Sequence, residues 1–443
     1  MMEVFSQAAH ALGMLLSSLQ GGLADVAMKF FPFFLLLELP LFVLVCVGMI
    51  RFGLRRLRPA PKPDRYPSVS CLVTCYSEGK DVAKTIESLA HQTYAGYIEI
   101  IAIIDGAVQN RDTLQAAQAQ LSVVNAMPNR RLIVLPKWQR GGRVSSLNAG
   151  LTMATAEVLM ALDGDTSFDN DMVANATRHF QDPKVMALAG CLRVRNASAS
   201  LVARLQALEY MVSIGGGKTG LSEYNIINNI SGAFGVFRAS MVRRIGGWDA
   251  GTAEDLDITL RIKQYFGRHP GLRIAFDPHA VGHTDAPTSW RVFFKQRMRW
   301  EGDLYYLLVR KYLRNIRPSL LGWRNFWFTV FNGFVMGLAM PFFILFYTVL
   351  MLWLMPLGVV LGLLGFIYLV YLALGIFFYL LYLVTVSERP RQDAGYLLLL
   401  PLMPLFAFVC RLHTAIAILQ EAVTRSHLDS SMAPWWVLRK TKY

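Results

Sequence analysis

The hydrophobic and polar positions divide the chain into three parts. Apolar runs occupy both ends, whereas the middle alternates short apolar stretches with mixed segments. Near the start, Phe30 to Ile50 is apolar except for Glu38 and is just long enough to cross hydrocarbon about 30 Å thick. After Trp300 come three more apolar runs, Phe326 to Leu354, Leu357 to Val386 and Tyr396 to Leu419. The pattern predicts a soluble body between membrane segments.

Two apolar segments leave alternatives open. Val4 to Ala27 carries several polar residues, so it is either a weak second span or an amphipathic helix at the membrane surface. The last run contains Arg411 and His413, so it either spans and leaves a basic tail outside, or is broken and re-entrant. The start of the chain has no compact signal-peptide pattern with a small-residue cleavage site, which predicts a retained anchor.

The middle of the chain, from Pro67 to about Pro287, alternates strands with helices. Strand and helix in alternation predict an α/β domain whose mostly parallel sheet is covered on both faces. Such sheets place their chemistry at the carboxyl ends of strands, so the residues just after each strand are the candidates for a site. Buried strands are predicted at Ser68–Thr74, Ile98–Ile104, Leu132–Leu135 and Val158–Leu162, and helices at Val82–Gln92, Thr113–Leu121 and Ser145–Thr155.

These patterns define five expected regions. They are a membrane region at 1–50 with a transmembrane helix at about 30–50, a soluble domain at 66–287, amphipathic interface helices at 288–325, transmembrane helices at 326–425, and a basic tail at 426–443.

Composition and charge narrow the class of protein. At 54% hydrophobic and 17% charged residues, the chain is too apolar for an ordinary soluble enzyme. The net charge of +14 would suit nucleic acid or an anionic membrane equally well. Position favours the membrane, with membrane lipid as a partner and no nucleic acid, because basic clusters adjoin the apolar runs. The clusters are Arg51, Arg55, Arg56, Arg58, Lys62 and Arg65 after the first run, and Arg310, Lys311, Arg314, Arg317 and Arg324 before the next.

The five cysteines predict a reducing compartment for the soluble part. They are an odd number without paired spacing, which argues against a disulfide framework. Cys71 and Cys75 lie in a strand-like apolar run, so we interpret them as packing residues.

Carboxylates follow two of the predicted strands. Asp105 closes the second strand before Gly106, although Asp-Gly is also an ordinary turn. Asp163 and Asp165 follow Val158–Leu162 and are separated by a glycine that would let a ligand approach closely. Paired carboxylates suit Mg²⁺ or Mn²⁺ bridged to a diphosphate. The same spacing recurs at 169 and 171 and at 255 and 257, so the preceding strand is what selects the first pair.

Two further groups of residues carry candidate chemistry. Glu254 and Asp255 open an amphipathic stretch, where a carboxylate could act as a general base or only cap a helix, with Asp257 on a solvated face. On a helix, the spacing of Gln296, Arg299 and Trp300 places them on one face, able to hold a diphosphate and stack on a sugar. For the neighbours Phe294, Lys295 and Arg297 we favour a position at the level of the lipid headgroups.

In this order, the motifs resemble the membrane-integrated, processive family 2 glycosyltransferases. The motifs are Asp105, Asp163-Gly164-Asp165, Thr252-Ala253-Glu254-Asp255 and Gln296-Arg297-Met298-Arg299-Trp300. The group includes poly-N-acetylglucosamine, hyaluronan, chitin and cellulose synthases. The likeness runs from about Ser68 to Trp300, and Ser231 to Arg238 is most similar to bacterial poly-β-1,6-N-acetylglucosamine synthases.

The resemblance implies a Rossmann-like GT-A domain in the cytoplasm, inserted between transmembrane helices, and a role for each matching residue. It assigns the catalytic base to Asp255 and a Mg²⁺ or Mn²⁺ site to Asp163 and Asp165. The chain departs from the family pattern at three places. The family usually has two consecutive acids where this chain has Ile104-Asp105, an Asn where it has Ser77, and a Lys where it has Arg143. Nucleotide and donor binding falls to Thr74, Tyr76, Glu78, Asp105, Arg143, Asp163, Gln296 and Arg299, and acceptor binding to Glu254, Trp300 and Gly232.

The function so implied is inverting, processive polymerisation of a nucleotide-activated sugar, with UDP-N-acetylglucosamine or a related UDP-sugar as donor. The acceptor is the growing polysaccharide, exported across the inner membrane, with a small accessory membrane or periplasmic protein as a further candidate partner. The alternative is transfer of a single sugar to a membrane lipid. A transporter or receptor with a degenerate nucleotide fold is disfavoured by the intact set of carboxylates.

Overall fold

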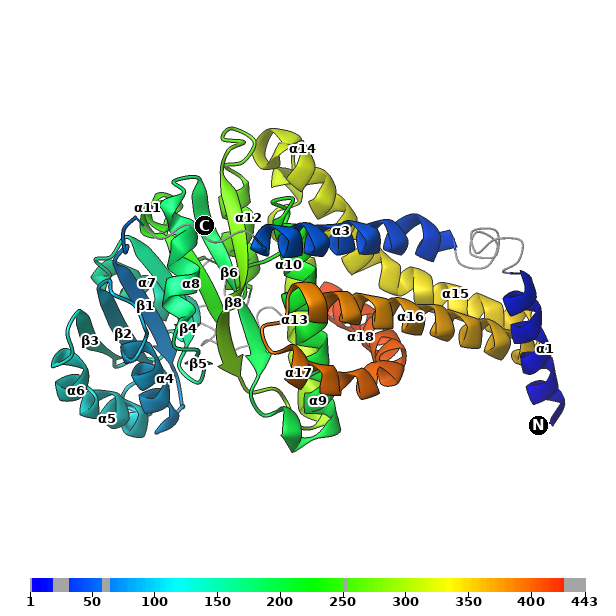
Figure 1. The fold of residues 1–443 in the computed structure, drawn as a ribbon, viewed down its shortest axis with the longest axis horizontal. Helices are drawn as coiled ribbons and strands as arrows, with labels where there is room; N and C mark the ends of the chain where they lie inside the picture. Colours follow the sequence, from blue (N-terminus) through cyan, green and yellow to red (C-terminus); the bar gives the residue numbers. More distant parts are fainter. Residues whose placement is uncertain (1, 19–31, 58–63, 250–252, 426–443) are drawn as a thin grey trace.

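The computed structural model describes residues 2–18, 32–57, 64–249 and 253–425. Figure 1 shows a sheet domain in one half and long helices that extend from it into the other. The domain is built on one eight-stranded sheet with the order β3-β2-β1-β4-β7-β6-β8-β5. The strands are β1 (Val69–Cys75), β2 (Ile98–Asp105), β3 (Arg130–Lys137), β4 (Val158–Asp163), β5 (Ser167–Phe168), β6 (Val185–Val194), β7 (Phe234–Arg238) and β8 (Arg273–Thr284).

The first half of the sheet is parallel and matches the predicted pattern. Strand β1 pairs in parallel with β2 and β4, and β2 pairs in parallel with β3. All residues of β1 and β2 are buried, as expected for strands covered on both faces. The four predicted strands and three predicted helices are confirmed, with small shifts at their ends. The helices are α4 (Asp81–Ala90), α5 (Arg111–Ala119) and α7 (Gly142–Met153).

The second half of the sheet is mixed and was not predicted. Strand β7 runs antiparallel to β4 and β6, β5 runs antiparallel to β8, and β6 and β8 are parallel. Asp277 and Pro278 interrupt the apolar pattern of β8, and the pairing of β6 with β8 changes register between Gly190 and Cys191. The sheet as a whole is mostly parallel, as predicted.

Helices cover both faces of the sheet. Val82, Ile86 and Leu89 of α4 pack into the core on one face. On the other face, Leu147 of α7 packs in the same core as Ile258 of helix α12 (Glu254–Lys263). All five cysteines are free, and Cys71 and Cys75 are buried in the core, so their interpretation as packing residues is confirmed. This packing brings the start of α7 and the start of α12 to the same edge of the sheet.

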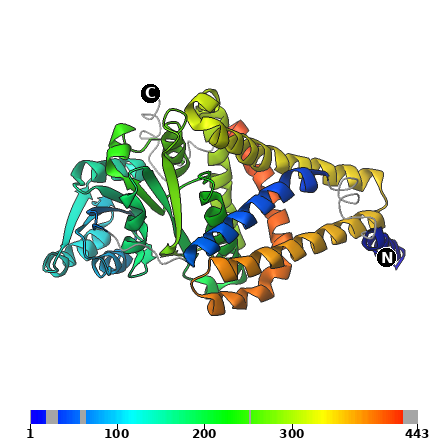
Figure 2. The same cartoon turned by 45° about the horizontal axis from the view of Figure 1, so that its top comes forward.

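Four helical stretches among the described residues are long and apolar enough to cross a membrane. They are Phe34–Arg56, Pro318–Leu354, Leu357–Thr385 and Pro390–Thr424. Figures 1 and 2 show them on one side of the sheet domain. Their elements are η2 (Phe34–Glu38), α3 (Leu39–Arg56), α14 (Pro318–Phe328), η8 (Thr329–Ala339), α15 (Met340–Leu354), α16 (Leu357–Thr385), α17 (Pro390–Asp393), η9 (Ala394–Leu402) and α18 (Met403–Thr424).

The structure bears on the segments that the sequence left open. Helix α1 (Met2–Ser18) is not among the four candidate spans and packs on α16, where Gly362 leaves no room for a side chain beside Ala11. Residues 19–27 of that segment lie outside the described residues. The last run is long enough to span, but it is not one α-helix, because the 3-10 segment η9, which contains Pro401, precedes α18. The predicted basic tail at 426–443 also lies outside the described residues.

The predicted interface region is helical and joins the two halves of the molecule. It contains α13 (Trp290–Tyr305), η6 (Tyr306–Lys311), η7 (Leu313–Asn315) and the first part of α14. Helix α13 packs against α18, where the rings of Phe293 and Phe406 lie 5.5 Å apart. The position of α13 beside the sheet is therefore fixed by a candidate membrane helix.

Candidate active site

A cavity of about 640 Å³ lies between the sheet domain and the helices of the candidate span that begins at Pro318. Its wall includes Phe328 and Asn332 from that span. The sequence-predicted residues that line it are Arg143, Asp163, Asp165, Gly232, Glu254, Asp255, Gln296, Arg299 and Trp300. Residues from five separate stretches of the chain thus meet in one cavity, and Asp163 and Asp165 lie where the carboxyl end of a parallel strand is expected to place a site.

Asp105 does not line the cavity and instead holds the turn that begins α7. It is buried, and its carboxylate accepts hydrogen bonds from Lys137 Nζ at 2.7 Å and from the backbone N–H groups of Gly141 and Gly142 at 2.8 Å. Gly142 has a φ of +78°, a conformation that favours glycine. Asp105 therefore fixes the start of the helix that carries Arg143, and its contact with a nucleotide stays a prediction.

Arg143 connects β1, β4, α12 and the loop before β7 at one end of the cavity. Its Nη1 forms an ion pair with Asp163 at the end of β4 and donates to Thr74 Oγ1 at 2.9 Å. Its Nε lies 2.7 Å from Oε1 of Glu254, and its Nη2 donates to the carbonyl oxygen of Gly232. One guanidinium group thus neutralises two carboxylates from different elements, and a planar fork of donors is suited to this task.

Two further predicted nucleotide contacts, Tyr76 and Glu78, lie just beyond β1. Tyr76 is 40% exposed, and the guanidinium carbon of Arg140 lies 4.2 Å from the centre of its ring. One carboxylate oxygen of Glu78 is buried without a hydrogen-bond partner, and burial raises the pKa of this carboxyl. Neither side chain lines the cavity, so their roles in binding the donor stay predictions.

Asp163 and Asp165 offer two carboxylates at one end of the cavity. Among the described residues there is no cluster of three or more His, Cys, Asp or Glu side chains able to hold a metal. A Mg²⁺ or Mn²⁺ ion needs only one or two protein carboxylates when substrate phosphates and water supply the other ligands. Asp163 keeps 32% of its side chain exposed although it pairs with Arg143. The donor set therefore fits a divalent ion that is shared with a diphosphate.

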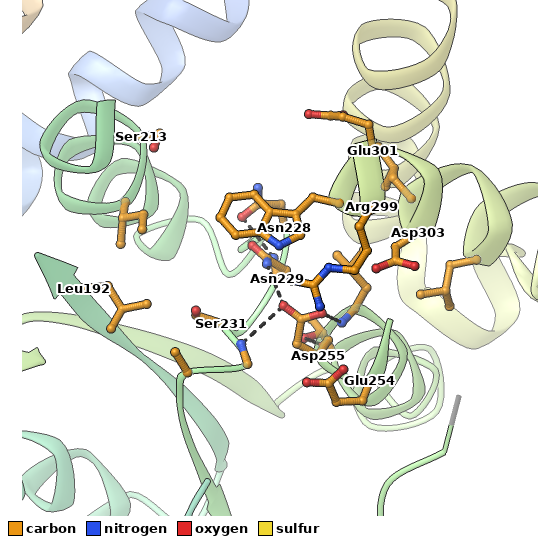
Figure 3. A pocket seen from close by; sticks show the side chains of 18 of the residues that line it. Leu192, Ser213, Asn228, Asn229, Ser231, Glu254, Asp255, Arg299, Glu301 and Asp303 are labelled. Atoms are coloured by element: carbon orange, nitrogen blue, oxygen red, sulfur yellow. Dashed lines mark hydrogen bonds between the residues drawn. The ribbon is translucent and has the colours of Figure 1, made fainter. Parts of the chain in front are cut away.

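Asp255 occupies the middle of the cavity wall, in the first turn of α12. Its Oδ2 accepts weak hydrogen bonds from the backbone N–H of Gly232 at 3.3 Å and from Asn229 Nδ2 at 3.5 Å, as Figure 3 shows. The side chain of Arg299 reaches from α13 toward it. Burial raises the pKa of the adjacent Glu254, whose carboxylate is committed to Arg143. Of the two acids, Asp255 is the one free to receive a proton from a ligand.

Helix α12 is held in place by Asp257, which the sequence placed on a solvated face. That prediction was wrong, because Asp257 is completely buried. Its carboxylate accepts hydrogen bonds from Lys311 Nζ at 2.7 Å, from the Tyr312 hydroxyl at 2.7 Å and from Arg261 Nε at 2.7 Å. Burial of this charge is tolerated because three donors surround it. The cluster ties α12 to the interface segment η6.

Helix α13 presents Gln296, Arg299 and Trp300 to the cavity, as their spacing predicts. The Oε1 atom of Gln296 is buried without a hydrogen-bond partner, so it is available to a ligand. Arg297 was expected at the level of the headgroups, and that prediction was wrong. It lines the cavity, forms an ion pair with Glu209, and its guanidinium carbon lies 5.0 Å from the centre of the Trp300 ring.

Sequence reasoning missed several residues of the site. Lys218 and Lys263 line the cavity and are buried, and Asn229 contacts Asp255. The run of three glycines before Lys218 was a signal of close packing that the sequence analysis did not use. Lys263 lies eight residues after Asp255. Residues four apart share one face of an α-helix, so this spacing places both on the same face.

The geometry suits the transfer of a group carried on a diphosphate. One end of the cavity holds paired carboxylates and an arginine, which together can bind a metal and a diphosphate. The middle holds a carboxylate that faces open space and can accept a proton. Trp300 offers an indole face on which a sugar ring can stack.

Comparison with known proteins agrees with this geometry. The profile of the family described as "Glycosyltransferase like family 2" matches residues 67–302, which is more than half of the chain. Among curated relatives, the poly-beta-1,6-N-acetyl-D-glucosamine synthase of Staphylococcus aureus (strain COL) is 28% identical over 300 residues, covering 66% of this chain and 69% of that protein. The synthase of the same name from Staphylococcus epidermidis is 28% identical over 269 residues, covering 60% and 62%.

A solved structure shares the fold. It is a mannosyltransferase from Pyrobaculum calidifontis in complex with GDP-Man and Mn²⁺, with a TM-score of 0.55 and 17% sequence identity. The similarity covers 87% of this chain and 96% of that one. The soluble domain accordingly has the GT-A fold, with apolar helices on both sides of it in the sequence.

Proposed function

The chain belongs to glycosyltransferase-like family 2, and on that premise we propose that it is an inverting polysaccharide synthase. The proposed reaction moves a sugar, N-acetylglucosamine in the first instance, from a UDP-sugar to the end of a growing β-linked polymer. The observation that carries the proposal is the meeting of Asp163, Asp165 and Asp255 in one cavity whose wall includes a candidate membrane span. The similarity to the staphylococcal synthases supports the choice of sugar.

In the proposed reaction, Asp255 takes the proton from an acceptor hydroxyl group. The acceptor oxygen bonds to the anomeric carbon of the donor while the bond from that carbon to the UDP oxygen breaks. Attack from the face opposite the leaving group inverts the anomeric configuration. The N–H groups of Gly232 and Asn229 orient the carboxylate of Asp255, and Glu254 remains with Arg143, so the two adjacent acids have separate tasks.

Charge develops on the diphosphate as the donor bond breaks. Arg299 and Gln296 lie on the face of α13 that borders the cavity, where they can bind the diphosphate. A divalent ion held by Asp163 and Asp165 would stabilise the charge of the departing diphosphate when it is bound. Arg143, which already pairs with Asp163, would keep that carboxylate pointed at the site. Thr74, Tyr76, Glu78 and Asp105 complete the proposed surroundings of the nucleotide.

The proposal extends to the membrane. A polar polymer cannot cross hydrocarbon without a protein-lined path, so synthesis beside candidate spans suggests coupled export. Phe328 and Asn332 belong to such a span and line the cavity. We place the protein in the inner membrane with its soluble domain in the cytoplasm, because basic residues adjoin the ends of the spans. A small export protein remains a candidate partner.

A panel of donors tests the proposal. Purified full-length protein in lipid nanodiscs is given UDP-N-acetylglucosamine, UDP-glucose and GDP-mannose, with Mg²⁺ or Mn²⁺, and the products are analysed by mass spectrometry. A ladder of added sugars from a UDP-sugar supports a synthase. Addition of a single sugar to a lipid would instead show that the protein is a lipid glycosyltransferase. The absence of transfer from every donor would overturn both candidate functions.

A further inference from the structure

Two buried lysines of the cavity wall have no ion-pair partner among the described residues. Lys218 is 5% exposed and Lys263 is 3% exposed, and both line the cavity. Among the described residues, neither ammonium group takes part in a hydrogen bond or an ion pair. Lys263 Nζ lies over the ring of Phe328, whose centre is 6.0 Å away. An unpaired buried ammonium group is costly, so it calls for an explanation.

Lys218 lies at the end of a π-helix, which places it in the wall of the cavity. It ends the π-helix η5 (Met211–Lys218), and π-helical turns occur often at functional sites. A side chain at Gly215 would lie 2.8 Å from Tyr382, and one at Gly216 would lie 2.8 Å from Phe378, both on α16. The glycines therefore let η5 press against a candidate membrane helix, and Lys218 faces the cavity, close enough to Asp255 for an electrostatic interaction.

Lys263 is placed by the regular geometry of α12. Asp255, Thr259 and Lys263 are spaced by four residues, so they share one face of the helix, and all three line the cavity. Eight residues of α-helix span about 12 Å. The face therefore runs from the proposed base to a second polar group further along the cavity, beside Phe328 in the candidate span.

We propose that Lys218 and Lys263 form an acceptor subsite, in which their ammonium groups donate hydrogen bonds to oxygen atoms of the glycan acceptor. This inference rests on the proposed function and adds the residues that hold the acceptor chain. An ammonium group can only donate, and a glycan offers many hydroxyl and ring oxygens. Lys218 contacts the sugar nearest Asp255, whereas Lys263 contacts a sugar further along the chain.

The state of the lysines without ligand supports a binding role. Burial lowers the pKa of Lys218 to about 8, against the opposing effect of the Asp255 charge, and that of Lys263 to about 7, so burial disfavours the charged form at both positions. A lysine retained only for structure would be paired or exposed, as Lys311 is with Asp257 and Asp249. Removing the charge from Lys218 should therefore leave the ligand-free protein as stable or more stable.

The test uses Lys218→Met and Lys263→Met, which keep side-chain length and remove the charge, with Lys184→Met at an exposed position as the matched control. Full-length protein in nanodiscs is assayed with UDP-N-acetylglucosamine and β-1,6-linked N-acetylglucosamine oligosaccharides of one to six sugars. We expect Lys218→Met to raise the acceptor KM by about tenfold or more at every length, at unchanged donor KM. Lys263→Met should raise the acceptor KM only for the longer acceptors, and Lys184→Met should leave it unchanged for every acceptor.

Two further measurements keep the test decisive. The melting temperature without ligand should not fall in Lys218→Met, because a fall would mean that the lysine supports the fold. Binding of the six-sugar oligosaccharide in the presence of UDP, measured by calorimetry, does not depend on turnover and should weaken in both cavity variants. Wild-type affinity in both would overturn the subsite while leaving the proposed function intact, whereas wild-type protein that transfers no sugar would defeat the proposed function itself.

Discussion

The two ends of the cavity differ in whether their charged side chains are paired within the protein. At the donor end, Arg143 neutralises Asp163 and Glu254 within the protein. At the membrane end, Lys218 and Lys263 are buried, and neither forms a hydrogen bond or an ion pair with any residue that the structure describes. Ion pairs within the protein hold the side chains of a site in place before a ligand binds. Charged groups without such partners gain hydrogen bonds only when a ligand supplies the acceptors. On the proposed function, the donor end is therefore organised by the fold, whereas the acceptor end would be completed by the acceptor.

Removing the carboxylate that lies between the two ends should have the largest effect. Asp255→Asn keeps the shape of the side chain but cannot accept a proton at neutral pH. We expect transfer to fall by about 10²- to 10⁴-fold, while UDP binding measured by calorimetry stays unchanged. The exposed Asp112 of α5 provides a matched control, Asp112→Asn, which should transfer at the wild-type rate. Wild-type turnover in Asp255→Asn would remove Asp255 from the mechanism.

Breaking the ion pairs of the donor end should have the next largest effect, and of the opposite sign to Lys218→Met. Arg143→Met leaves the carboxylates of Asp163 and Glu254 together without a cation. Because breaking a buried pair leaves an uncompensated charge, we expect the free energy of unfolding to fall by about 3 kcal/mol. Arg143→Lys should recover much of that loss.

Thermal unfolding of Arg143→Met and Lys218→Met side by side measures this contrast. We expect a lower melting temperature than wild type in Arg143→Met and an equal or higher one in Lys218→Met. Equal losses in both variants would mean that the two ends of the cavity do not differ in the way described.

A smaller change at the centre of the cavity tests how tightly the two acids are placed. A methyl group at Gly232 would lie 3.0 Å from Oε1 of Glu254 and 3.6 Å from Cβ of Asp255. We expect Gly232→Ala to slow transfer by about tenfold and to cost about 1 kcal/mol of stability, because α12 must shift slightly. Gly375→Ala in α16, where no atom lies within 4 Å, is the control and should behave as wild type. A rate equal to wild type in Gly232→Ala would show that the position tolerates movement.

The sequence predicted the parallel half of the sheet because its strands are short, continuous apolar runs with turn signals between them. It also placed the carboxylates correctly, since Asp163 and Asp165 follow directly on such a run. Strand β8 was not predicted because Asp277 and Pro278 break its apolar pattern, and its pairing with β6 shifts register next to the same residues.

Buried charges were the least predictable feature of the site. Asp257 and Arg297 both read as exposed residues of amphipathic helices. Asp257 is buried and Arg297 is largely covered because each has a partner from a distant part of the chain, Lys311 for Asp257 and Glu209 for Arg297. Local spacing identifies the face of a helix but not what will cover it, so burial of a charge depends on long-range packing.

The stereochemistry of the first bond formed tests the central claim most directly. If Asp255 activates the acceptor in a single displacement across this cavity, an α-linked UDP-sugar must yield a β-linked product. Nuclear magnetic resonance of the disaccharide made from UDP-N-acetylglucosamine and a soluble acceptor reads that linkage. A β configuration is the predicted result, and an α configuration would contradict the assignment of Asp255 and of the whole cavity to one inverting step.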